Sequence, residues 1–324
     1  MSGKENGALD SLGLGFVRAT EAAAYAACKM AGRGDQKGAD QVAVDAMRTA
    51  MNALHMDGEI VIGEGERDEA PMLFIGEKVG NGKGLGVDIA LDPLEGTTLT
   101  AKGAANALAV VAVAEKGGLL NAPDTYMEKI AVGGGLPAGV VDLDADPADN
   151  IRAIAKAKKV GAREVCACIL DRPRHEEMIG KVRSTGARVN LISDGDVAGV
   201  INTTDPSTGV DIYMGVGGAP EGVLAAAALR AIGGQMQARL VFRNDDERGR
   251  ASRIGITDFE KKYELSELAR SDVLFIASGV TDGSLLRGVH VRRGQAHIDT
   301  LLLSSAHQEM RWIRGRHPVS TYGD

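Results

Sequence analysis

Two carboxylates, Asp92 and Glu95, lie three residues apart in the sequence and are followed directly by Gly96 and Thr97. The glycine allows the backbone to turn sharply, and the threonine places a hydroxyl beside the second carboxylate. Oxygen ligands of this kind suit hard cations, which in turn polarise a bound phosphate. The spacing therefore indicates metal-assisted chemistry on a phosphorylated substrate.

The residues before this corner predict a strand, because apolar and polar side chains alternate over 86–91. Pro93 is expected to end the strand, since proline cannot continue a ladder of hydrogen bonds. An apolar run over 107–114, a Lys-Gly-Gly turn and a short strand at 119–120 then predict a hairpin. The strand leading to the corner is thus expected to continue into an antiparallel sheet.

Three further carboxylates lie at predicted strand ends or helix starts. Asp40 stands at the start of a helix predicted over 39–53, Glu64 follows a predicted strand, and Glu221 lies in a glycine-rich loop. A solvated acidic loop explains Glu64 and its acidic neighbours equally well, so both interpretations stay open there. Oxygen-only ligands favour Mg²⁺ or Mn²⁺, and four or five converging carboxylates require cations to offset their repulsion.

After residue 150 the sequence alternates between helix and strand patterns, which is typical of α/β proteins with ligand sites at the carboxyl ends of strands. Strands are predicted at 164–170, 188–192 and 210–216, and their ends carry residues 171–175, 194–196 and 217–222. The last of these loops is glycine-rich, but no Gly-Lys-Ser/Thr follows it, so a nucleotide site is a weak interpretation.

Basic and acidic side chains at these strand ends suit a sugar phosphate. Arg172, Arg174 and His175 form a candidate anion clamp, with a solvated loop as the alternative. Asp194 and Asp196 flank a glycine and are placed to accept hydrogen bonds from sugar hydroxyls. Capping of the next helix is the alternative for one of the two aspartates.

The patterns predict a mixed α/β fold of two domains: a metal-binding domain over 1–160 and a sugar-phosphate-binding domain over 161–324. A short acidic linker is expected at 142–149, and the basic, irregular tail from 311 is free to pack back on the first domain. Other expected elements are a helix at 9–31, a charged, exposed, irregular segment at 242–253, and strands at 272–278 and 296–304.

The composition excludes some partners. The 324 residues carry a net charge of −7, which disfavours nucleic acid and anionic membranes because both require a basic face. No run has the length of a membrane-spanning helix, and no signal-peptide core is expected at the start. The three cysteines include no Cys-x-x-Cys pair, which favours reduced, mostly buried thiols and a cytoplasmic location.

A resemblance to a known family sharpens these expectations. The segment Asp92-Pro93-Leu94-Glu95-Gly96-Thr97 resembles the Asp-Pro-Ile-Asp-Gly-Thr signature of the lithium-sensitive, metal-dependent sugar phosphatases, which include inositol monophosphatase. Glutamate in place of the second aspartate points to the class II fructose-1,6-bisphosphatases of the bacterial GlpX type. Further similar motifs occur in family order at 32–35, 39–40, 60–66, 68–73, 121–124, 126–127, 172–175, 194–196 and 217–222.

The resemblance implies a two-domain layered α/β sandwich and a set of site residues. Asp40 and Glu64 would hold one metal, and Asp92, Glu95 and Glu221 the others, with Mg²⁺ or Mn²⁺ as the ion. Thr97 would help to orient or deprotonate the attacking water, with Asp40 as its partner. The residues implied to contact substrate are Glu95, Gly96 and Thr97 at the scissile phosphate, and Tyr126, Arg172, Pro173, Arg174, Asp194, Gly195, Asp196 and Gly218 at the sugar and its distal phosphate.

The implied reaction is hydrolysis of the 1-phosphate of fructose 1,6-bisphosphate, in gluconeogenesis, glycerol metabolism or the Calvin cycle. Sedoheptulose 1,7-bisphosphate, alone or in addition, is the alternative substrate. A non-catalytic sugar-phosphate sensor and an inositol-type monophosphatase are the rival functions. The first predicts lost metal ligands, and the arginine pair argues against the second. A homo-oligomer, dimer or tetramer, is also expected.

Overall fold

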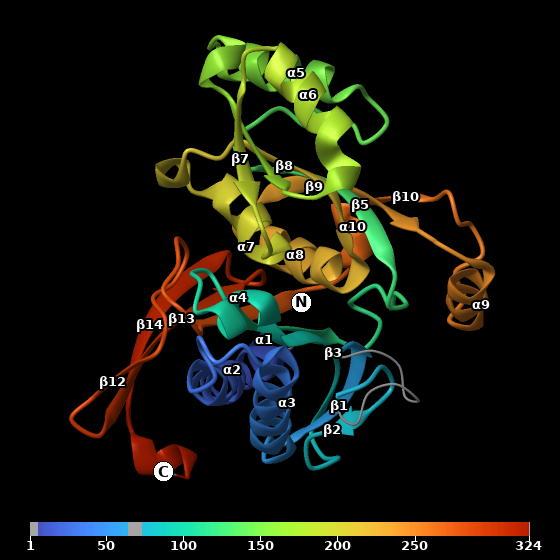
Figure 1. Cartoon of the computed structure of the whole chain (residues 1–324). Coiled ribbons are helices and arrows are strands. Elements are labelled where there is room, and N and C mark those ends of the chain that lie inside the picture. Colours follow the sequence, from blue (N-terminus) through green and yellow to red (C-terminus); the bar gives the residue numbers. More distant parts are fainter. Residues whose placement is uncertain (1–5, 64–72, 324) are drawn as a thin grey trace. The chain divides into compact units, whose positions relative to one another are not determined.

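A computed structural model describes residues 6–63 and 73–323 and shows a mixed α/β protein with two separate sheets. The chain divides into two compact units: unit 1 is Met1–Leu120 with Arg270–Asp324, and unit 2 is Asn121–Ala269. Figure 1 shows the elements of both units. No helix in the described part of the chain is long and apolar enough to cross a membrane.

Unit 1 combines four helices with an eight-stranded sheet in its described residues. The helices are α1 (Asn6–Asp10), α2 (Gly13–Cys28), α3 (Gln36–Asn52) and α4 (Thr97–Lys102). The strands are β1 (Met56–Ile62), β2 (Lys78–Val79), β3 (Leu85–Glu95), β4 (Leu108–Glu115), β11 (Val273–Gly279), β12 (His290–Arg292), β13 (Gln295–Ser304) and β14 (Glu309–Pro318).

The sheet of unit 1 has the order β12-β13-β11-β4-β3-β1-β2, and β14 pairs with β13. Only β1 and β3 run parallel; the other described pairs are antiparallel. Helices α2 and α3 lie side by side (Figure 1), and their small and apolar side chains pack with β3, β4 and β11 in one core. Alanine-rich helices pack closely on a sheet because they carry little side-chain volume, which explains a core with few aromatic residues.

The strand into the acidic corner differs from the sequence-based prediction. Pro93 does not end it, because β3 continues to Glu95. The pairing of β3 with β4 shifts its register between Asp92 and Glu95, and the proline lies in that irregularity, where no regular ladder donor is required. The predicted hairpin at 107–120 is also wrong: β4 pairs with β3 and β11, which supply the antiparallel sheet instead.

Unit 2 contains a six-stranded sheet between two layers of helices. The strands are β5 (Tyr126–Gly133), β6 (Cys166–Leu170), β7 (Arg188–Ile192), β8 (Ile212–Gly218), β9 (Gly234–Val241) and β10 (Lys262–Glu264). The α-helices are α5 (Pro147–Lys158), α6 (Glu176–Ser184), α7 (Asp196–Ile201), α8 (Ala219–Ile232), α9 (Asp245–Arg253) and α10 (Leu265–Leu268), and a 3₁₀ turn, η2, covers Pro173–His175.

The strand order in unit 2 is β10-β9-β5-β8-β6-β7, with β6 parallel to β7 and β8. Helices α5 and α6 pack with the apolar side chains of β5, β6 and β8 on one face. Helices α7 and α8 pack together and contact β5 and β8 (Figure 1). The predicted strands at 164–170, 188–192 and 210–216 are confirmed with small shifts of their ends.

Several segments of the chain have more structure than their sequences indicate. Segment 242–253 is not irregular: Asn244 caps α9 by accepting a hydrogen bond from the Glu247 N–H at 2.9 Å. The tail is not irregular either, since β14 pairs along its whole length with β13. Strands β5 and β9 were not predicted. Their pairing partners, including each other, are distant in sequence, and local patterns carry little of that information.

The two units do not have the expected bounds of 1–160 and 161–324. Residues 121–160 belong to unit 2, because β5 pairs with β8 and β9. The expected acidic linker is part of that unit: Asp142 accepts a hydrogen bond from Lys262 at 2.9 Å, and Asp146 caps α5. The C-terminal segment from Arg270 onwards belongs to unit 1.

Candidate active site

The acidic corner of unit 1 is built by the end of β3 and the start of α4. Glu95 is the last residue of the strand and is 2% exposed. Gly96 caps the helix with φ +91°, and a Cβ there would lie 2.9 Å from Leu99, so the tight turn favours glycine. Thr97 is the first helical residue and is half-buried. The turn therefore places a carboxylate, backbone N–H groups and a hydroxyl in sequence at one corner.

Asp40 lies on α3, which packs against both β3 and α4. The helix begins earlier than predicted, at Gln36, because Asp35 caps it by accepting a hydrogen bond from Gly38 N–H. The preceding loop is attached to α4, since the N–H groups of Gly32 and Gly34 each donate to α4 carbonyls at 2.9 Å. Asp40 is half-buried, and this burial raises the pKa of its carboxyl.

The predicted metal ligands are only partly brought together. Within the described ranges, no three His, Cys, Asp or Glu side chains lie close enough to one another to hold a metal ion. Glu64 lies outside the described residues, and Glu221 belongs to unit 2. The donors in unit 1 nevertheless fit Mg²⁺ or Mn²⁺ by type, because Asp40, Asp92 and Glu95 offer only carboxylate oxygens in largely buried positions.

In unit 2, two neighbouring side chains take the place of a missing strand partner. The β6–β8 pairing covers only Ala167 and Cys168 on β6, so further along β8 lacks that neighbour. The Val216 N–H donates to His175 Nε2 at 2.8 Å, and the Val216 carbonyl accepts from Arg174 Nε at 3.0 Å. The turn Pro173–His175 is thereby fixed to the end of β8.

His175 is not part of an anion clamp, contrary to the prediction. Its ring is 1% exposed, and Nδ1 lies 2.8 Å from the Leu170 carbonyl oxygen. Burial lowers the pKa of His175, and the positive charge of Arg174 lowers it further. The ring is therefore neutral, with Nδ1 donating to Leu170 and Nε2 accepting from Val216. Arg172 and Arg174 remain as the cationic groups of this turn.

Tyr126, at the start of β5, lies close to two guanidinium groups. The centre of its ring is 5.0 Å from the Arg174 guanidinium carbon and 4.8 Å from that of Arg243. Arg243 Nε donates to Glu247 at 2.6 Å, and Glu247 is 1% exposed. Arg243 lies in the segment 242–253, which its sequence predicts to be irregular and exposed, so its position beside Tyr126 was not predicted. The stack gives this end of the sheet two cations beside an aromatic ring.

The turn at residues 194–196 leads into α7. Gly195 has φ +92° and occupies the cap position, and its N–H donates to Asp194 Oδ1 at 3.2 Å. Burial raises the pKa of Asp194, although the Gly195 N–H and Arg172 oppose the shift. Asp196 is buried and forms an ion pair with Lys129 of β5. No local pattern pointed to Lys129, which lies in an unpredicted strand.

The glycine-rich loop of unit 2 accommodates carboxylates rather than a nucleotide. A Cβ on Gly217 would lie 1.9 Å from Asp196 Oδ2, and one on Gly218 would lie 2.0 Å from Glu221 Oε2. Burial raises the pKa of Glu221, and the Lys129 ammonium opposes that shift. These glycines are required because acidic side chains approach the backbone closely at the start of α8.

The predicted site residues therefore fall into two groups, each held within one unit. Unit 1 holds Asp40, Asp92, Glu95, Gly96 and Thr97, and unit 2 holds Tyr126, Arg172, Pro173, Arg174, Asp194, Gly195, Asp196, Gly218 and Glu221. All of those in unit 2 lie at one edge of its sheet, at the start of β5 or at the carboxyl ends of β6, β7 and β8.

Comparison with known proteins identifies the family. The model of the family described as bacterial fructose-1,6-bisphosphatase, glpX-encoded, matches residues 10–317. The chain is 48% identical over 320 residues to fructose-1,6-bisphosphatase 1 class 2 of Escherichia coli strain K12, covering 94% of this chain and 95% of that protein. The class 2 fructose-1,6-bisphosphatase of Shigella flexneri gives the same identity and coverage. The match spans both units, and the chain thus belongs to the glpX-encoded family of bacterial fructose-1,6-bisphosphatases.

Proposed function

We propose that this chain hydrolyses the 1-phosphate of fructose 1,6-bisphosphate to give fructose 6-phosphate and inorganic phosphate. The observation that carries the proposal is the corner at the end of β3, where buried Glu95, left-handed Gly96 and Thr97 follow one another at the start of α4. Backbone N–H groups and a hydroxyl beside a carboxylate suit a metal-bound phosphate. Membership of the bisphosphatase family supports the same reaction.

The proposed roles in unit 1 follow from position and chemistry. Thr97 Oγ1 orients the attacking water, and an Asp40 carboxylate oxygen accepts the proton that the water loses. The N–H groups at the Gly96–Thr97 turn hold the phosphate oxygens. A divalent cation, Mg²⁺ or Mn²⁺, would polarise the phosphate and be held by Asp40, Glu64, Asp92, Glu95 and Glu221.

The proposed roles in unit 2 concern the sugar and its distal phosphate. Arg172 and Arg174 supply positive charge for that phosphate, and Tyr126 keeps the Arg174 guanidinium in place by stacking. Asp194 accepts hydrogen bonds from sugar hydroxyls, while the Gly195–Asp196 turn, Pro173 and Gly218 border the sugar. A cationic site for a second phosphate distinguishes a bisphosphatase from a monophosphatase.

The test is phosphate release from a panel of substrates: fructose 1,6-bisphosphate, sedoheptulose 1,7-bisphosphate, fructose 6-phosphate and inositol 1-phosphate. Each is assayed with Mg²⁺ or Mn²⁺, with and without lithium. Fructose 1,6-bisphosphate should have the highest kcat/KM, and hydrolysis should require the cation. The proposal is contradicted if a monophosphate is hydrolysed faster than fructose 1,6-bisphosphate, or if no substrate of the panel is hydrolysed. Comparison of the two bisphosphates decides the substrate preference.

Thr97→Ala provides a sharper test, because Thr98 offers a matched control. Both threonines lie in the first turn of α4 and are half-buried. Loss of the Thr97 hydroxyl should lower kcat by roughly 10²–10⁴-fold, the range for a group that assists proton transfer. Thr98→Ala should stay within a few fold of the parent. Equal kcat values for the two variants would remove Thr97 from the mechanism.

We further propose a cytoplasmic homo-oligomer, dimer or tetramer, that acts in gluconeogenesis or glycerol metabolism. The location is supported by the three cysteines, Cys28, Cys166 and Cys168, which form no disulfide with one another. Most soluble oligomers are symmetric homo-oligomers, and dimers are the commonest of them. Light scattering coupled to size exclusion measures the oligomer; a molecular mass equal to the 33.8 kDa chain contradicts it.

A further inference from the structure

One buried cation in unit 2 connects the segments that carry the proposed substrate residues. Lys129 lies on β5, and its side chain is 0% exposed. Its ammonium donates to Asp196 Oδ2 at the start of α7 and to the Gly218 carbonyl oxygen at 2.9 Å, at the end of β8. A buried lysine requires such partners, because an unpaired ammonium in the interior is strongly disfavoured.

The surroundings of Lys129 are shaped for its side chain. A Cβ on Gly222 would lie 3.3 Å from Lys129 Cδ, and one on Gly217 would lie 3.0 Å from Nζ. Gly217 precedes the carbonyl that accepts from the ammonium, and Gly222 lies in the first turns of α8. Glycines thus leave the side chain of Lys129 room to pass between β5, β8 and α8.

The charge of Lys129 also affects the pKa of the Glu221 carboxyl. The positive charge of Lys129 favours its ionised form, whereas burial disfavours it. Asp196 and Gly218 are therefore linked to Lys129 by hydrogen bonds, and Glu221 is linked to it by charge. They come from three places in the chain: the start of α7, the end of β8 and the first turn of α8.

We propose that Lys129 is a positioning residue for substrate binding: it joins the start of α7 to the Gly218 end of β8 and so fixes the backbone that borders the sugar phosphate. The inference rests on the proposed function, because it assigns a task to Lys129 in that site. The ammonium itself is enclosed and bonded to protein atoms, so it acts through Asp196 and Gly218. Substitutions of such supporting groups typically lower activity by roughly 10–100-fold.

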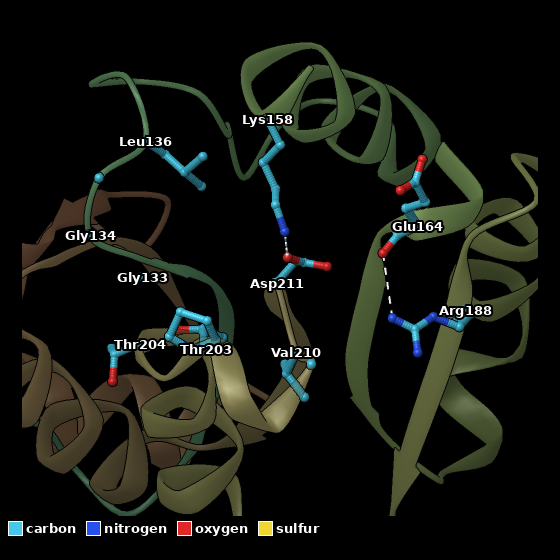
Figure 2. Close-up of a pocket in the computed structure, with 13 residues that line it drawn as sticks. Gly133, Gly134, Leu136, Lys158, Glu164, Arg188, Thr203, Thr204, Val210 and Asp211 are labelled. Carbon is cyan, nitrogen blue, oxygen red and sulfur yellow. Dashed lines mark hydrogen bonds and ion pairs between the residues drawn. The ribbon is translucent and has the colours of Figure 1, made fainter. Parts of the chain in front are cut away.

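The main variant is Lys129→Met, which keeps most of the unbranched side chain and removes the ammonium group with its charge. A matched control is Lys158→Met in the same unit. Lys158 also pairs with an aspartate, Asp211, but it lines a cavity of about 280 Å³ at the opposite end of the sheet (Figure 2). Figure 2 shows the Lys158 ammonium directed at Asp211.

Two measurements separate positioning from mere stability. The first is the split between KM and kcat for fructose 1,6-bisphosphate, and the second is calorimetric binding of fructose 6-phosphate without added metal. Lys129→Met should raise KM and weaken product binding by at least 10-fold, while Lys158→Met should change neither. A folded Lys129→Met protein with the KM and product affinity of the parent overturns the inference. A parent that does not hydrolyse the bisphosphate overturns the proposed function instead.

A second set of variants covers the case in which Lys129→Met does not fold because Asp196 is left unpaired. Lys129→Met/Asp196→Asn removes both charges together, and Asp196→Asn alone completes a double-mutant cycle. If the two side chains act as one unit, the double variant should bind fructose 6-phosphate no more weakly than Asp196→Asn. A double variant that is at least 10-fold weaker than the Asp196→Asn single variant overturns the inference, because Lys129 then acts independently of Asp196.

Discussion

The Pro173–His175 turn offers the most direct test of how unit 2 is held together. His175→Leu removes an imidazole that is 1% exposed and replaces it with an apolar side chain that forms no hydrogen bonds. Two bonds are lost: the one that His175 donates to the Leu170 carbonyl, and the one that it accepts from the Val216 N–H, both at 2.8 Å.

The two losses differ in their effect on the free energy of unfolding. The Leu170 carbonyl still accepts from the Arg172 N–H at 2.9 Å, so losing its second bond costs about 0.5–1.5 kcal/mol. The Val216 N–H loses His175 Nε2, the acceptor that it has instead of a β6 residue. Leaving a buried donor without an acceptor costs about 1–3 kcal/mol. The sum is about 1.5–4.5 kcal/mol. In a unit of roughly 150 residues each kcal/mol lowers Tm by about 2–4 °C.

The assay is urea unfolding of the parent and the variant, followed by circular dichroism, with scanning calorimetry as an independent measure. His307→Leu is the control, because His307 is half-exposed in unit 1 and pairs with Asp10. A surface pair of this kind contributes about 0–1 kcal/mol. The transition assigned to unit 2 should move clearly for His175→Leu, and the control should change little.

The reasoning is refuted if His175→Leu unfolds at the same urea midpoint and with the same slope as the parent. That outcome would mean that the Val216 N–H finds another partner at no cost. The variant should also lose affinity for the bisphosphate, because Arg174 is held on the same Val216 residue. If His175→Leu binds the bisphosphate more weakly but is as stable as the parent, the ring does not stabilise the fold.

Three further predictions concern pH, a glycine and the metal. Burial lowers the pKa of His175 in the folded protein, whereas a histidine in the unfolded chain has a pKa of about 6.5. When the pH falls below 6.5, the unfolded chain therefore binds a proton before the folded protein does. The contribution of His175 to the free energy of unfolding is fully present above pH 6.5 and decreases below it by up to about 1.4 kcal/mol per pH unit. Urea midpoints of the parent between pH 7.5 and 5 should show this slope, and those of His175→Leu should lack it. Gly217→Ala should displace the Lys129–Asp196 pair and lower Tm, since its Cβ would lie 1.9 Å from Asp196 Oδ2; Gly180→Ala, with nothing within 4 Å in helix α6, should leave Tm unchanged or raise it. Removal of divalent cations with EDTA should abolish phosphate release, and added Mg²⁺ or Mn²⁺ should restore it; full activity after dialysis against EDTA would contradict the metal assignment.

The acidic corner shows how far local sequence is informative. The strand, the sharp turn at Gly96 and the hydroxyl of Thr97 all follow from neighbouring residues, and the structure contains each of them. The end of the strand could not be predicted, because Pro93 lies in an irregular stretch of pairing with β4. That irregularity depends on how β3 pairs with β4, and the residues around the proline do not encode this pairing.

Unit 2 shows the complementary limit. Arg174 and His175 are adjacent in sequence, and both were predicted to belong to an anion clamp. The ring of His175 is nevertheless buried and neutral. The difference arises because β6 pairs with β8 only near its start, so that Val216 requires side-chain partners. Lys129 is a stronger case. It lies in a strand whose partners, β8 and β9, are both distant in sequence.

By itself, the sequence determined the mixed α/β class, the family and the chemical types at the candidate site, because spaced carboxylates, glycines and hydroxyls are local features. Only the tertiary structure decided the bounds of the two units, the neutral state of His175, the place of Arg243 beside Tyr126 and the task of Lys129. The physical reason is that burial and partners set the charge and the role of a polar side chain. Several of those partners lie far away in the chain: Val216 is 41 residues from His175, and Asp196 is 67 residues from Lys129.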